Sequence, residues 1–125
     1  MDYRKQQLLE IRKWMVYVIP NSSCWKRTHA HCDGTRTICK HSLKNSYASL
    51  WTLLHEIGHI ETKTKSMKRC ESESAATRWG INRIKELGLP VKRKYALAYK
   101  KYIKMTYDRG IRRGLAKRIK SKLYM

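Results

Sequence analysis

Two histidines and a glutamate lie close together near the middle of the chain, in the order His55-Glu56-Ile57-Gly58-His59. Histidines four residues apart lie about 40° from each other around an α-helix, so both imidazoles can bind the same cation. The glutamate between them then lies beside the cation, within reach of a water molecule. This spacing predicts a zinc site with His55 and His59 as ligands and Glu56 as the general base of a hydrolytic reaction.

The segment that carries this motif is strongly apolar. From about residue 46 to residue 60, apolar side chains lie almost all round a helical wheel, which predicts a buried helix. Burying three polar groups there is costly unless something pairs them, and a metal ion pairs all three. Gly58 predicts close approach by another element, because a glycine inside a helix costs about 1 kcal/mol relative to alanine. The alternative is a chance match to the motif.

A catalytic zinc ion usually takes three protein ligands and leaves the fourth position to water, so one more ligand is required. No histidine follows His59. The carboxylates and the thiol downstream are Glu61, Cys70, Glu71, Glu73, Glu86 and Asp108. We predict Glu73, because small residues nearby allow its helix to approach closely. Glu71 is the alternative, and both acids also fit a simpler role at a helix N-terminus.

Three other segments are expected to form regular structure in the first 90 residues. Residues 3–15 predict a short amphipathic helix. Residues 28–32 and 35–40 flank Asp33-Gly34, a dipeptide that accepts the positive φ angles of a two-residue turn, so we expect a small antiparallel hairpin. Residues 70–87 predict a helix that Gly88 and Pro90 terminate, and the short loop before it makes it an antiparallel neighbour of the motif helix.

Residues 73–80, Glu73-Ser74-Ala75-Ala76-Thr77-Arg78-Trp79-Gly80, resemble the second motif of the ImmA/IrrE-like gluzincin peptidases, E-x-E-A-(D/N)-x-(F/W)-A. That family carries H-E-x-G-H on the preceding helix, which residues 55–59 match. The resemblance spans about residues 28–89 and implies that Glu73 is a zinc ligand. Thr77 stands where the family has an Asp or Asn, which in gluzincins helps to orient a zinc-bound histidine.

We predict an α+β, zincin-like domain over residues 1–90, with a small antiparallel β element, the active-site helix and an antiparallel ligand helix. For residues 91–125, on which the resemblance has no bearing, we predict a basic helical extension packed on the same domain. Members of the family cleave DNA-bound transcriptional repressors, often in phage or mobile-element switches. We therefore expect a zinc-dependent endopeptidase. The alternatives are a non-enzymatic nucleic-acid-binding protein and a phage protein that titrates an acidic host partner.

The net charge of +20 comes from 29 Lys and Arg against 9 Asp and Glu in 125 residues. This length suits one compact domain, and the charge predicts an anionic partner. No apolar run reaches the roughly 20 residues of a membrane-spanning helix, and no signal peptide is recognisable, so we expect a soluble, cytoplasmic protein. The oligomeric state stays open.

Residues 91–125 are the most basic part of the chain, with 13 Lys or Arg against one acid. Three tyrosines recur there at helical spacing: Tyr95, Tyr99 and Tyr102. Gly110 and Gly114 are expected to divide the segment into two helices. Two interpretations fit: the cations and rings bind the phosphates and bases of a nucleic acid, or the charged face is solvated and the tyrosines pack on the domain.

Three further roles are expected around the motif. A Tyr or Arg of the basic segment is expected to stabilise the oxyanion of the transition state. Trp51 and Trp79 are expected to be core residues, with the wall of a substrate cleft as the alternative. Six possible ligands precede the motif: Cys24, His29, His31, Cys32, Cys39 and His41. We expect reduced thiols and surface imidazoles there, and a second, structural zinc ion is the alternative.

Overall fold

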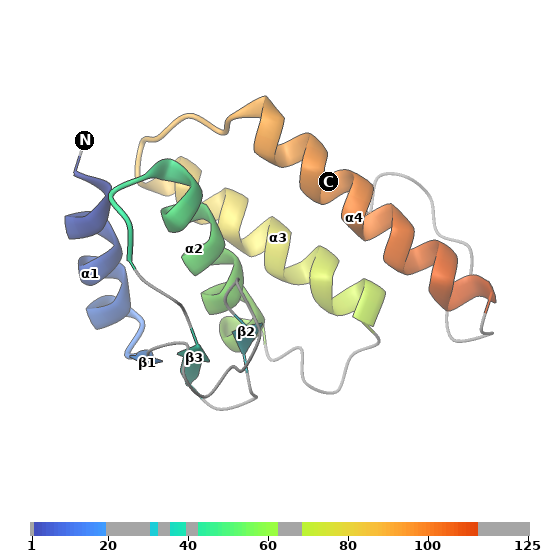
Figure 1. The fold of residues 1–125 in the computed structure, drawn as a ribbon, viewed down its shortest axis with the longest axis horizontal. Helices are drawn as coiled ribbons and strands as arrows, with labels where there is room; N and C mark the ends of the chain where they lie inside the picture. The colour runs from blue at the N-terminus through green and yellow to red at the C-terminus, as the bar shows by residue number, and fades with distance from the viewer. Residues whose placement is uncertain (1, 20–30, 33–35, 40–42, 63–68, 113–125) are drawn as a thin grey trace.

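The computed structural model describes residues 2–19, 31–32, 36–39, 43–62 and 69–112. Within them the helices are α1 (Tyr3–Lys13), α2 (Tyr47–Glu61), α3 (Arg69–Glu86) and α4 (Arg93–Arg112). The strands are β1 (Tyr17–Ile19), β2 (His31–Cys32) and β3 (Thr37–Cys39). α2 and α3 lie side by side, with α1 and the strands next to α2 and with α4 next to α3 (Figure 1).

The described part of the chain is predominantly helical, so the predicted α+β, zincin-like fold is wrong. The described helices contain 11, 15, 18 and 20 residues, whereas the strands contain 3, 2 and 3. β2 and β3 are antiparallel, as predicted, but β3 also pairs in parallel with β1, in the order β1-β3-β2. Strands this short cannot cover an apolar helix, and α1 and α3 supply most of the cover of α2. The predicted turn at Asp33-Gly34 lies outside the described residues.

α2 begins where the sequence predicts a helix. Ser46 is its N-cap: the backbone there is extended, and the side-chain hydroxyl accepts a hydrogen bond from the Ser49 amide at 3.2 Å. Four apolar side chains of α2 are 0% exposed: Leu50, Leu53, Leu54 and Ile57. Burying one such side chain contributes about 1.5–3 kcal/mol, so α2 is the central helix of the core.

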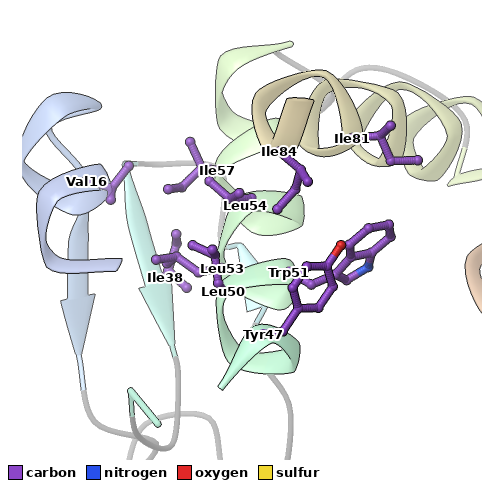
Figure 2. Close-up of a cluster of buried hydrophobic side chains, with 10 residues drawn as sticks. All are labelled: Val16, Ile38, Tyr47, Leu50, Trp51, Leu53, Leu54, Ile57, Ile81 and Ile84. Carbon is purple, nitrogen blue, oxygen red and sulfur yellow. The ribbon is translucent and has the colours of Figure 1, made fainter. Parts of the chain in front are cut away.

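Side chains from the sheet and from α3 cover this central helix. Figure 2 shows Ile38 of β3 beside Leu50 and Leu53, and Ile84 of α3 beside Leu54. Ile38 and Ile84 are both 0% exposed. Among the strand side chains that the structure describes, Ile38 of the middle strand is the buried one.

A buried ion pair joins α1 to α3. The Glu10 carboxylate, 1% exposed, accepts hydrogen bonds from Arg83 Nε at 2.6 Å and from Arg83 Nη2 at 2.8 Å. Trp14 Nε1 donates to the same carboxylate, and its ring lies 5.0 Å from that of Trp79. Removing one partner of a buried pair costs about 3–5 kcal/mol, so this contact fixes α1 on α3. Trp79 is partly buried and packs against the edge of the core.

The tyrosines of α4 pack against the core. The ring centroids of Tyr95 and Tyr99 lie 5.7 and 5.6 Å from that of Trp51, which is 5% exposed. Ile103 and Tyr107, further along α4, are 0% and 2% exposed. Tyr95 and Tyr99 are thus partly buried and packed on the core, which leaves little of their faces for stacking on bases. Trp51 is a core residue, as predicted.

The predicted helix break at Gly110 is wrong, because α4 continues through this residue to Arg112. A single glycine inside a helix costs only about 1 kcal/mol, less than the packed turns before it contribute. Gly114 and the rest of the basic segment lie outside the described residues. The division of the chain at residue 90 stays a prediction. No described helix has both the length and the apolar character needed to cross a bilayer.

Gly58 allows the backbones of α2 and α3 to touch. A Cβ atom at this position would lie 2.6 Å from the carbonyl oxygen of Ala76, much closer than such atoms approach each other. The close approach that a helix-interior glycine predicts is therefore present. Because α2 and α3 also carry the motif residues, this contact sets the distance across the candidate site.

Gly58→Ala is expected to destabilise the protein by about 1–3 kcal/mol, because the added methyl group forces α2 and α3 apart. The free energy of unfolding in denaturant measures this. Gly80→Ala is the matched control: a Cβ there meets His55 N at 3.5 Å, an ordinary contact. Alanine has the higher helix propensity by about 1 kcal/mol, so the control is expected to be neutral or stabilising. Equal stability of the two variants would contradict the close approach.

Candidate metal centre

The candidate site lies between α2 and α3, where the two helices come closest. Gly58 and Gly80 stand at two points of close approach, each against the backbone of the other helix. His55 and His59 lie one turn apart on α2, and Glu73 lies on the facing part of α3. Small residues at the crossing therefore bring all three predicted ligands together.

The three ligand side chains converge on one point. Glu73 Oε2 is 2.9 Å from His55 Nε2 and 3.4 Å from His59 Nε2, and the three ligand atoms all lie within 4.8 Å of one another. Ligand atoms held at about 2.0–2.1 Å around a tetrahedral zinc ion lie about 3.4 Å apart, so the observed spacing fits such an ion. These residues are close enough to bind a metal ion.

The protonation states of these residues suit a cation. Burial lowers the pKa of His55 below its usual value, although Glu73 beside it acts in the opposite direction, so the imidazole is neutral at pH 7. Burial alone raises the pKa of Glu73, but hydrogen bonds with His55 and His59 and their charges outweigh it and lower this pKa to about 2. A neutral imidazole and an ionised carboxylate are the forms that bind a metal ion.

Two hydroxyl groups on α3 contact the outer nitrogens of the histidines. Thr77 Oγ1 lies 3.3 Å from His55 Nδ1, and Ser72 Oγ lies 3.0 Å from His59 Nδ1. Both hydroxyl groups are thus placed to orient the imidazole rings. A hydroxyl can donate to a bare Nδ1 or accept from Nδ1–H, whereas a carboxylate only accepts. With a proton on Nε2, Nδ1 is bare and accepts a hydrogen bond from the hydroxyl. With a metal ion on Nε2, Nδ1 carries the proton and donates to the same hydroxyl, so the contact that orients the ring is kept.

Glu56 and Tyr99 lie in the immediate surroundings of the ligands. Glu56 is 7% exposed, on the same turn of α2 as His55. The ring of Tyr99 reaches the site from α4 and lies 4.7 Å from the His55 ring and 5.6 Å from the Trp51 ring. Burial, followed by the negative charges of Glu56 and Glu73, raises the pKa of Tyr99. Its hydroxyl therefore keeps its proton at neutral pH.

The structure places Glu73, and not the other candidate third ligands, beside the histidines. Glu71 is exposed and lies two residues away on another face of α3. Cys70 is buried in a separate small cluster with Ile103. The remaining three carboxylates either pair with arginines elsewhere or are exposed: Glu61, Glu86 and Asp108.

Sequence reasoning missed Ser72 and the position of Tyr99. Ser72 is adjacent to Glu73 in the chain, and hydroxyl residues are so frequent that this adjacency alone carries no signal. Thr77 lies four residues after Glu73, on the same face of α3, which is the spacing that identifies a side chain directed at the same site. The contact of Tyr99 depends on how α4 packs, and the local pattern does not contain that information.

The second group of possible ligands falls largely outside the described residues. Three of its members, His31, Cys32 and Cys39, have their backbone in β2 and β3. The side chains of all six lie beyond what the structure describes. A second, structural metal ion in this region stays a prediction.

Comparison of the chain with protein-family models, with curated proteins and with solved structures finds no match. The resemblance to the ImmA/IrrE-like peptidases therefore depends on the two motifs alone. The geometry of His55, His59 and Glu73 stands independently of it, and it defines a candidate metal centre between α2 and α3.

Proposed function

We propose that the protein is a zinc-dependent peptidase of the gluzincin type, related to the ImmA/IrrE-like family. The observation that carries the proposal is the convergence of His55, His59 and Glu73 on one point. Structural zinc sites use four protein ligands, whereas catalytic sites use three and keep one position open. In the described part of the chain, the cluster holds no fourth His, Cys, Asp or Glu, which favours the catalytic type.

In this proposal each neighbouring side chain has a defined task. Zinc, when bound, supplies Lewis acidity, which lowers the pKa of a water molecule toward about 7. Glu56 accepts the proton of the attacking water and passes it to the leaving amine. Glu56 is buried, and it precedes the ligand His59 by three residues on α2. Thr77 and Ser72 hold the rings of the two histidines in orientation through their contacts with Nδ1.

Tyr99 fits the role of donor to the oxyanion, the role that the sequence left to an unidentified residue of the basic segment. The Tyr99 ring lies 4.7 Å from the His55 ring, and its raised pKa keeps the hydroxyl protonated and able to donate. Preorganised donors at the developing negative charge are usually the largest single contribution to such a reaction. The proposed substrate is a protein, and the resemblance favours a DNA-bound transcriptional repressor.

The proposal is tested by incubating a peptide library with the metal-free protein and with the same protein after zinc is restored. Mass spectrometry is expected to detect new peptide termini only in the zinc-loaded sample. The cleavage should stop when a chelator is added and return when zinc is added in excess. A folded protein that binds one zinc ion but cleaves no peptide and no protein substrate would contradict the peptidase activity.

A further inference from the structure

α4 presents a row of positive charges to solvent over most of its length. Six exposed residues form this surface, which we call the basic face of α4: Arg93, Lys94, Lys100, Lys101, Lys104 and Arg109. At 1.5 Å per residue, the row from the first to the last of these is about 24 Å long. At 100° per residue, all six fall within about half of the helix circumference. Asp108 is the single acidic residue of α4.

The opposite face of α4 is already occupied. Tyr95 and Tyr99 pack on Trp51, and Ile103 and Tyr107 are buried. A helix that lies in a membrane surface needs its apolar face free for insertion, and α4 does not have it free. Single-stranded nucleic acids are bound largely by stacking of their bases on exposed aromatic rings. Tyr95 and Tyr99 are partly buried against Trp51, and Tyr107 is buried. The exposed half of α4 also carries Asp108, Leu97 and Met105 among the cations. Two separate apolar side chains do not make an insertion face, and the half offers no aromatic stacking platform.

A regular row of phosphates complements such a surface. Double-stranded DNA carries one negative charge for about every 1.7 Å of its axis, so a row about 24 Å long faces many phosphates. The major groove of B-form DNA is about 12 Å wide and admits an α-helix, whereas the major groove of double-stranded RNA is too narrow for side chains to read. Charge and shape together favour duplex DNA over duplex RNA.

We propose that the basic face of α4 binds the phosphate backbone of double-stranded DNA, without sequence preference. This binding does not depend on the metal centre or on the proposed peptidase activity. The six cations lie on the side of α4 that points away from Trp51, so DNA would lie outside the site that α2 and α3 form. Both activities can therefore be carried by one chain at the same time.

The binding is tested with two quadruple variants that remove the same amount of charge. The first replaces Lys94, Lys100, Lys101 and Lys104 with Gln, on the basic face of α4. The matched control replaces Arg4, Lys5, Arg12 and Lys13 with Gln, all exposed on α1, which packs on the other side of the α2–α3 pair (Figure 1). Fluorescence anisotropy of a short labelled duplex measures affinity between about 50 and 200 mM salt. Circular dichroism establishes that each variant is folded.

The dependence of DNA affinity on salt concentration measures how many phosphate contacts each variant has lost. Each phosphate contact contributes about 0.9 to the slope of the logarithm of affinity against the logarithm of salt concentration. The α4 variant is expected to lose about 3 to 4 units of slope and at least tenfold in affinity, whereas the α1 variant should lose less than about 1 unit. Wild-type protein should prefer the duplex to a single strand of equal length and to vesicles of anionic lipid.

Three results would overturn the proposal. Equal losses in the two variants would mean that total charge, and not the basic face of α4, binds the DNA. A preference for single strands or for anionic vesicles would identify a different ligand. Absence of salt-dependent binding by the wild-type protein would exclude the interaction. Peptide cleavage by the α4 variant is measured in parallel, so a failure of DNA binding is distinguishable from a failure of the proposed peptidase.

Discussion

Replacing Glu73 with alanine is expected to lower the affinity of the protein for zinc by more than about 100-fold. Loss of a residue that merely orients a metal ligand already costs about 10- to 100-fold, and Glu73 is proposed as a direct ligand. Its carboxylate is also the group that both histidines contact, at 2.9 and 3.4 Å. Titration calorimetry with zinc, together with metal analysis of the purified protein, measures the effect.

The matched control for this experiment lies two residues away on the same helix. Glu71→Ala removes the same charge from the first turns of α3, but Glu71 is exposed and outside the cluster. It is expected to leave zinc affinity nearly unchanged. If Glu73→Ala kept one zinc ion per chain, or if Glu71→Ala lost it, the assignment of the third ligand would be wrong.

The convergence of His55, His59 and Glu73 could be predicted from the sequence because the relations that produce it are local. His55 and His59 lie one turn apart on a helix whose N-cap, Ser46, and apolar positions are visible in the pattern. Glu73 was found because small residues around it allow close packing, and Gly58 predicted the contact with α3 that the structure contains. A helical repeat fixes such relations before any tertiary contact is known.

The fold class could not be predicted in the same way, because it depends on contacts between distant residues. β3 was expected as one half of a hairpin, yet it also pairs in parallel with β1, which joins Tyr17 to Thr37. The pair of Glu10 and Arg83 is separated by 73 positions in the chain. The dipeptide Asp33-Gly34 predicts a hairpin, but β2 and β3 are only two and three residues long. A local sequence pattern predicts that a strand or turn is present, but it does not predict how much of the core that element covers.

The contacts between α4 and the site show the same limit. The spacing of Tyr95, Tyr99 and Tyr102 was compatible with core packing and with nucleic-acid binding, because periodicity gives a face but not its partner. The rings of Tyr95 and Tyr99 contact Trp51, so for these two residues core packing is the correct interpretation. The cations on the other half of the helix remain exposed, and the proposed DNA binding concerns that half alone.

Replacing Glu56 with glutamine is expected to abolish most peptide cleavage while the zinc content stays at one ion per chain. Glutamine has the same shape as glutamate but cannot accept the proton of the attacking water. General base catalysis contributes about 100- to 10,000-fold, so kcat should fall by about this factor. Cleavage of a peptide that the wild-type protein hydrolyses and metal analysis of the same samples measure the two quantities together.

Glu61→Gln separates this effect from a general change in α2. Glu61 ends the same helix, lies partly exposed and pairs with Arg36 at 2.6 Å, away from the three ligands. The control should retain both zinc and cleavage. Full activity of Glu56→Gln would exclude Glu56 as the base. Loss of zinc from Glu56→Gln would instead mean that the Glu56 carboxylate is a metal ligand. A general base removes a proton from water and does not bind the metal ion, which His55, His59 and Glu73 hold in the proposal.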